Sequence, residues 1–280
     1  MSVTYKDDGD LFIVELDRCL MVPIVRTVEE EKTRGEELFS DTVRRAQRLG
    51  GLDVSINAVW YDVSKLYGVD ILDGDDPVSA AATTNQGEVV LANATRFGNP
   101  NPDQFYAAQN KDLTWKFGFG NLPRDQNIRT GISGLCPLII NGLKYGTGNK
   151  YKSGVPEGAP VTGAPGAKYE PYLIQRNNNR YASLAGTKYP SGTGKAGFGI
   201  TATGRGYVIV QAHLIQGGGV TFDVFRDKFI SLGCTNALAC DGSDSVFMYR
   251  GGAFVVDSAI RVSHNKIETM TCGLGFKENK

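Results

Sequence analysis

The chain has 280 residues, and its 30 basic and 30 acidic residues give a formal net charge of zero at neutral pH. This balance provides no overall field that would attract nucleic acid or an anionic membrane surface, and no apolar run is long enough to span a bilayer. With 41% hydrophobic residues and 35 glycines, the composition predicts a globular protein rich in strands and turns. It leaves open whether the protein is a homo-oligomer.

The cysteines and the N-terminus bear on the cellular compartment. The five cysteines are an odd number, are scattered along the chain, and include no pair at metal-ligand spacing. This pattern favours reduced, buried thiols over a disulfide framework. The first residues, Met1 to Asp8, do not have the composition of a signal peptide. We therefore expect a cytoplasmic protein.

The N-terminal part predicts two strands and a helix. Residues 11–16 (LFIVEL) and 20–25 (LMVPIV) have the composition of strands, and the turn at Asp17 between them predicts a hairpin. Residues 35–49 carry apolar side chains at helical spacing, and Gly50 follows them at the position where a helix ends.

A strand is predicted at residues 54–61 (VSINAVWY), where polar and apolar side chains alternate, and Asp62 follows it. Asn57 and Asp62 are candidate ligand-binding residues. The competing interpretation, which the residues alone favour, is that Asn57 satisfies a neighbouring backbone group, since most polar residues in strands are structural.

The acidic run that follows, residues 69–77, lacks the spacing and the closing Glu of a calcium loop. We predict a solvated turn there, and no metal and no cofactor for the chain as a whole. Residues 88–92 and 113–119 are predicted strands.

A second informative segment covers residues 129–142. Residues 137–140 (PLII) predict a short buried strand, and Asn141 followed by Gly142 is a strong hairpin turn signal. Arg129 begins the segment and could offer its guanidinium to a phosphate. Residues 146–168, rich in Gly, Pro, Ser and Lys, predict a flexible loop inserted into a single domain that spans residues 1–280.

The stretch from Gly194 to Gly251 has the strongest organisation. Residues 207–212 (YVIVQA) predict a strand, residues 221–232 a helix with Thr221 or Gly219 as its cap, and residues 237–240 a second strand. Residues 246–249 and 253–256 predict further strands, and residues 260–276 close the sheet. Ligands of strand–helix–strand units gather at the carboxyl ends of the strands.

The second of those strands ends in an acidic turn of small residues, made of Asp241, Gly242, Ser243, Asp244 and Ser245. Together with Lys195 to Gly199, the strand at 207–212 and the Leu232-Gly233 helix end, this turn resembles the C-terminal half of the phosphodiester glycosidase family. The resemblance covers most of residues 11–276 and is most specific over residues 194–250. It implies an α+β fold, a single domain with a curved mixed β-sheet and few helices.

The resemblance also implies a function, the hydrolysis of a sugar–phosphate phosphodiester at the anomeric carbon. Asp241 corresponds to the carboxylate that would act as nucleophile or general base, and Lys195 to a cation that would hold the phosphate. His213 follows the strand at 207–212 and titrates near neutrality, so it could serve as acid or base. A purely structural His213 is an equally good interpretation. The expected partner is a small sugar-phosphate or nucleotide-like ligand.

Two departures from the family pattern keep other functions open. Lys195 stands where the family often has Arg, so the positive charge is kept but the two parallel hydrogen bonds that a guanidinium can make to an anion are lost. Ser243-Asp244 replaces a glycine pair and adds a carboxylate. A non-catalytic sugar-phosphate or nucleotide-binding protein on the same fold is therefore the main alternative, and a structural or assembly protein is the third. Because family members are often secreted, the expected cytoplasmic location suggests an intracellular or phage-encoded relative.

Overall fold

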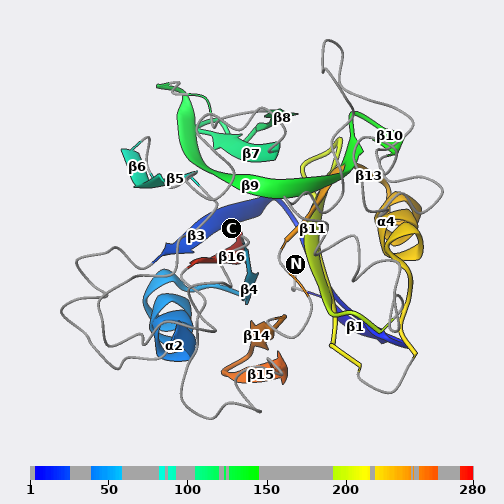
Figure 1. Cartoon of the computed structure of the whole chain (residues 1–280). Coiled ribbons are helices and arrows are strands. Elements are labelled where there is room, and N and C mark those ends of the chain that lie inside the picture. The colour runs from blue at the N-terminus through cyan, green and yellow to red at the C-terminus, as the bar shows by residue number, and fades with distance from the viewer. Residues whose placement is uncertain are drawn as a thin grey trace, which may run out of the picture.

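The computed structural model describes residues 4–25, 39–58, 82–85, 88–92, 105–119, 123, 126–144, 192–214, 218–240, 242, 246–257 and 272–279. Strands dominate these residues (Figure 1). The two helices among them are α2 (Phe39–Gly50) and α4 (Phe222–Ser231). Neither is long and apolar enough to cross a membrane.

The strands described form a large and a small sheet. The large sheet has the order β1 (Thr4–Asp8), β2 (Leu11–Leu16), β12 (Gly206–Gln211), β11 (Lys195–Thr201), β13 (Cys234–Ala239), β9 (Ile128–Ile140), β5 (Ala82–Asn85) and β6 (Glu88–Ala92). Off this path, β7 (Phe105–Asn110) pairs with β9 and with β8 (Trp115–Phe119), and β10 (Leu143–Lys144) pairs with β9. The small sheet has the order β15 (Ala253–Val256), β14 (Met248–Arg250), β4 (Val54–Asn57), β16 (Cys272–Glu278) and β3 (Cys19–Val25).

Both faces of the large sheet are covered, because its central strands carry apolar residues on both sides. On one face, Val14 and Phe198 belong to a core shared with residues of the small sheet such as Ile56. On the other face, Ile13 and Ile209 pack with the phenylalanines of α4. The result is a three-layer arrangement of helix, large sheet and small sheet (Figure 1).

The predicted strand–helix–strand unit is present. The chain passes from β12 through α4 to β13, and Thr221 caps the helix by accepting a hydrogen bond from the Val224 N–H at 3.3 Å. Strand β11 lies between β12 and β13 and is antiparallel to both. The two flanking strands therefore run parallel to each other and end at the same edge of the sheet.

Two of the sequence predictions about the sheet are wrong. Every strand pairing between the described residues is antiparallel, so they show no mixed sheet; the parallel pair β12 and β13 is separated by β11. The predicted hairpin of residues 11–16 and 20–25 is also absent, since β2 joins the large sheet and β3 the small one. The turn between them bonds to the C-terminal strand, where Glu278 accepts a hydrogen bond from the Asp17 N–H at 3.0 Å.

Candidate functional site

The candidate site lies at the edge of the large sheet where β12 and β13 end and β11 begins. The register places Lys195 opposite Gln211, the last residue of β12. On the other side of β11, the Cys240 N–H donates to the Ala196 carbonyl at 2.8 Å. The carboxyl end of β13 and the residues after β12 therefore flank the beginning of β11, as the strand–helix–strand pattern predicts.

Lys195 is the central side chain of this edge. It faces α4, as do Gly197 and Gly199, and only 1% of its surface is exposed. Its ammonium donates to the Thr193 carbonyl at 2.6 Å and lies 5.0 Å from the centroid of the Phe222 ring. Desolvation lowers the pKa of Lys195 to about 7, because burial disfavours the charged form. The group can therefore exchange a proton near neutral pH.

Gln211 extends the polar arrangement around Lys195. Its amide nitrogen donates to the Thr193 carbonyl at 2.9 Å, and its amide oxygen accepts from the Val220 N–H at 2.6 Å. Thr193 O thus accepts from two buried side chains, which fixes the segment that enters β11. Gln211 was not among the residues predicted from the sequence. The sequence pattern that could have indicated it is a polar residue near the end of the otherwise apolar run 207–212.

His213 lies at the same edge, two residues beyond β12. Its Nδ1 accepts a hydrogen bond from the Gly194 N–H at 3.2 Å. An imidazole nitrogen that accepts is unprotonated, so a neutral ring carries its proton on Nε2. The side chain is half-buried. His213 is thus adjacent to β11, as expected of a site residue, and its hydrogen bond also gives it a structural role.

Gly242 is held against the beginning of β11. A Cβ at this position would collide with the Gly194 carbonyl oxygen and lie 3.6 Å from Lys195 Cα. A side chain is therefore excluded there, and Gly242 itself lies close to the backbone of Lys195. Asp241, Ser243, Asp244 and Ser245, which complete the predicted acidic turn, lie outside the described residues, as do Asp62 and the predicted loop insertion at 146–168.

Asn57 ends β4 in the small sheet and is 1% exposed. Its side-chain oxygen accepts from the Phe247 N–H at 3.4 Å. This contact supports the interpretation of Asn57 as a residue that satisfies neighbouring backbone. A ligand contact from Asn57 stays a prediction.

Arg129 is not brought together with Lys195. Its guanidinium donates to the Met21 carbonyl at 2.9 Å and to the Gln109 side-chain oxygen at 3.3 Å. Desolvation lowers the pKa of Arg129. Met21 lies two residues after Cys19, and the Cys19 N–H donates to the carbonyl of Gly204. Gly204 follows the end of β11, whereas Lys195 is at its beginning. In this structure Arg129 therefore joins strands, and its predicted phosphate contact has no support from its position.

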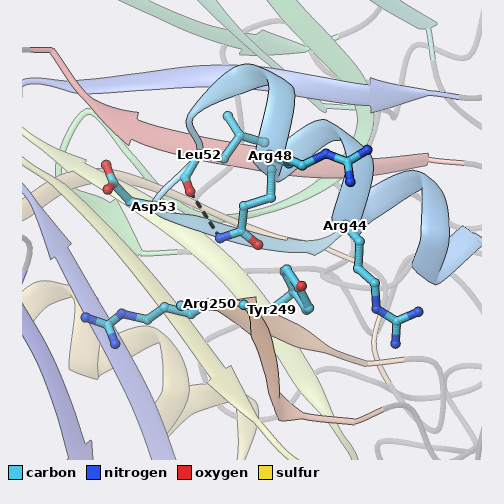
Figure 2. Close-up of a pocket in the computed structure, with 9 residues that line it drawn as sticks. Arg44, Arg48, Leu52, Asp53, Tyr249 and Arg250 are labelled. Carbon is cyan, nitrogen blue, oxygen red and sulfur yellow. Dashed lines mark hydrogen bonds between the residues drawn. The ribbon is translucent and has the colours of Figure 1, made fainter.

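Among the described residues no metal-binding group is found, and two cavities lie away from this edge. The described His, Cys, Asp and Glu residues include no group of three that could hold a metal ion. Two cavities are lined by other residues. One, of about 420 Å³, lies between α2 and the β14–β15 hairpin (Figure 2), and the other, of about 440 Å³, is lined by residues that include Trp115, Phe117 and Thr201.

The fold is similar to that of an enzyme domain whose structure has been solved. The catalytic domain of zebrafish N-acetylglucosamine-1-phosphodiester alpha-N-acetylglucosaminidase, solved in a form auto-inhibited by its pro-peptide, superimposes with a TM-score of 0.60. The match covers 99% of this chain and 82% of the zebrafish chain, at 15% sequence identity. A hypothetical protein from Synechocystis matches 98% of this chain and 61% of its own length at 12% identity, with a TM-score of 0.41.

No protein-family model and no curated protein matches the sequence. At 15% identity, the zebrafish match shows a shared fold alone. The phosphodiester glycosidase-like fold expected from the residues is thus supported by structure and not by sequence comparison.

Proposed function

We propose that this chain is a hydrolase that cleaves the glycosidic bond of a sugar-1-phosphodiester or a related sugar-phosphate ligand. The observation that carries the proposal is the position of buried Lys195 at the edge where β12 and β13 both end, with His213 and Gly242 against the same segment. The fold shared with a domain that the zebrafish structure names as a glycosidase supports it.

The proposed reaction needs one carboxylate and little acid catalysis. Water attacks the anomeric carbon, the bond from that carbon to the phosphate oxygen breaks, and the phosphate leaves as a monoester anion without needing a proton. A carboxylate near the sugar stabilises the positive charge that develops, or attacks as a nucleophile. We propose Asp241 for this role because its chain neighbours, Cys240 and Gly242, both lie against the first residues of β11.

The burial of Lys195 changes the role proposed for it. With 1% of its surface exposed, the side chain offers a phosphate oxygen almost no access. We propose instead that its positive charge favours the ionised form of Asp241, since an opposite charge nearby lowers the pKa of a carboxyl group. His213, which is half-buried, is then the group proposed to exchange a proton with the attacking water.

The test is an assay of sugar release by mass spectrometry. Wild type and an Asp241→Asn variant are incubated with a panel of sugar-1-phosphodiesters and nucleotide sugars. We expect wild type to release free sugar and Asp241→Asn to lose at least about a hundredfold in rate, as expected when a group that acts on the reacting atoms is removed. The matched control is Asp7→Asn, which changes an exposed carboxylate on edge strand β1.

Full activity in Asp241→Asn contradicts the proposed site, and loss of activity in Asp7→Asn as well points to a general effect of the change in charge. The Ser243-Asp244 pair, which replaces a glycine pair in the acidic turn, favours a second candidate, a sugar-phosphate-binding protein without turnover on the same fold. Recovery of an intact ligand with the wild-type protein, and no released sugar, supports that function.

A further inference from the structure

The cavity between α2 and the β14–β15 hairpin has the features of a second ligand site. Its volume of about 420 Å³ lies in the range of small-molecule pockets, roughly 300–1,000 Å³. Its lining comes from α2, from the residues just before β4, and from the hairpin turn. None of the residues proposed above for glycosidic cleavage belongs to this lining.

Two arginines give the cavity its charge. Arg44 and Arg48 both line it, both are exposed, and they are separated by one turn of α2. Like charges at this spacing repel each other, and an anion bound beside them would remove the repulsion. Figure 2 shows both side chains extending toward the same side of the view, and Asp53 at the opposite side. Asp53 is engaged with the backbone, since its carboxylate accepts from the Glu278 N–H at 2.8 Å.

An aromatic ring beside the cavity orders one of these cations. The Arg44 guanidinium lies 5.4 Å from the centroid of the Phe254 ring. That ring meets Tyr249, which lines the cavity, edge to face at 4.8 Å. A cation held over an aromatic face loses less conformational freedom when it binds an anion.

The hairpin turn leaves room for a ligand. Gly251 and Gly252 line the cavity and have φ angles of 60° and 86°. A Cβ built on either would have no heavy atom within 4 Å. A ligand can therefore approach the backbone of this turn closely.

The wall also contains two polar atoms that are not satisfied. The side-chain oxygen of Gln47 and Nε of Arg250 are buried and have no hydrogen-bond partner among the residues that the structure describes. The Gln47 nitrogen donates to Leu52 O at 3.0 Å, the bond drawn in Figure 2. Buried polar atoms nearly always have partners, so the Gln47 oxygen is a candidate acceptor for a polar molecule in the cavity. The Arg250 guanidinium extends away from Arg44 and Arg48 and lies 4.8 Å from the centroid of the Tyr5 ring.

We propose that this cavity binds a small organic phosphate. The phosphate group lies against Arg44 and Arg48, whose planar guanidiniums suit its oxygens. Its hydroxylated part extends toward Gln47 and the Gly251–Gly252 turn. This site is separate from the Lys195 edge, and the proposal does not depend on the glycosidase reaction.

The test is a titration of the full chain with glucose 6-phosphate, followed by NMR of the backbone amides and by calorimetry. We expect saturable shifts of the Gly251 and Gly252 amides. The Arg44→Gln/Arg48→Gln double variant should bind at least about tenfold more weakly, through the loss of charge-assisted hydrogen bonds. Arg48→Gln alone provides a second, milder variant at an exposed position.

Two variants serve as controls. Arg205→Gln removes an exposed guanidinium that pairs with Glu15 on the large sheet, and Lys195→Met neutralises the candidate catalytic edge. Both should bind as wild type does. The proposal is overturned if the wild type shows no saturable shift at millimolar ligand, if the double variant binds with unchanged affinity, or if either control weakens binding as much as the double variant.

Discussion

Lys195 combines two properties that rarely occur together, a formal charge and almost complete burial. Its ammonium donates to a backbone carbonyl and lies over an aromatic ring inside the protein. Such surroundings disfavour the charged form, and the pKa falls to about 7. Residues with strongly shifted pKa values often lie at functional sites, which is consistent with the role proposed for this edge.

The shift predicts how stability depends on pH. Between the folded pKa of about 7 and the ordinary lysine value of 10.5, the unfolded chain binds a proton that the folded chain does not. The contribution of Lys195 to the free energy of unfolding therefore rises with pH across this window, by at most about 1.4 kcal/mol per pH unit. It is fully present above the unfolded pKa and is lost as the pH falls through the folded pKa.

The measurement is urea unfolding of wild type and Lys195→Met at pH 7 and pH 9. We expect Lys195→Met to gain less stability than wild type between the two values. Lys111→Met, at an exposed position, is the control and should follow wild type. The same pH dependence in Lys195→Met and wild type would contradict a depressed pKa.

At the scale of elements, α4 and β11 depend on each other through two glycines. A Cβ on Gly197 would lie 2.6 Å from Leu238 O and 3.2 Å from the Phe225 ring. A Cβ on Gly199 would lie 2.6 Å from the Phe229 ring. The helix packs this closely on the sheet only because β11 has no side chains at these positions, and this packing buries Lys195 beside Phe222.

This contact predicts the effect of a single methyl group. Gly197→Ala should lower the free energy of unfolding by about 1–3 kcal/mol, the usual effect of overpacking a core. Gly50→Ala is the matched control, because its Cβ would meet Leu52 at an ordinary 3.4 Å. Thermal or urea unfolding measures both. A Gly197→Ala protein as stable as Gly50→Ala would show that α4 is not seated on β11 in this way.

The same elements show what could be predicted from the sequence. Local patterns located α4 with its Thr221 cap, and the Asn141-Gly142 turn, where both residues have positive φ. They could not show that β2 and β3 enter different sheets, because β12, which pairs with β2 on the side away from β1, and β16, which pairs with β3, lie far along the chain. The predicted hairpin is wrong for that reason.

In the candidate site, too, features that are local in the sequence could be predicted and contacts between distant segments could not. His213 and Lys195 were predicted and do lie together, since both flank a strand–helix–strand unit that is local in sequence. Gln211 was missed because one glutamine after an apolar run carries no motif. Arg129 was predicted from its position at the start of the segment 129–142, and its actual neighbour, Met21, is more than a hundred residues away.

At the scale of the whole molecule, the comparison shows a shared fold that sequence comparison does not reveal. The identity of 15% over 99% of the chain is too low to carry residue roles from one protein to the other. What the two share is the fold, over 99% of this chain and 82% of the zebrafish chain. The charge of the molecule is neutral, so recognition of an anionic ligand depends on individual cations and not on a global field.

In the proposed reaction, water adds to the anomeric carbon of the sugar and not to the phosphorus. The most direct measurement is hydrolysis of a sugar-1-phosphodiester in water enriched in oxygen-18, followed by mass spectrometry of both products. Cleavage of the glycosidic bond places the heavy oxygen on the anomeric carbon of the released sugar, and this is the predicted result. Heavy oxygen in the phosphate product would mean that a phosphorus–oxygen bond breaks and would contradict the glycosidase assignment.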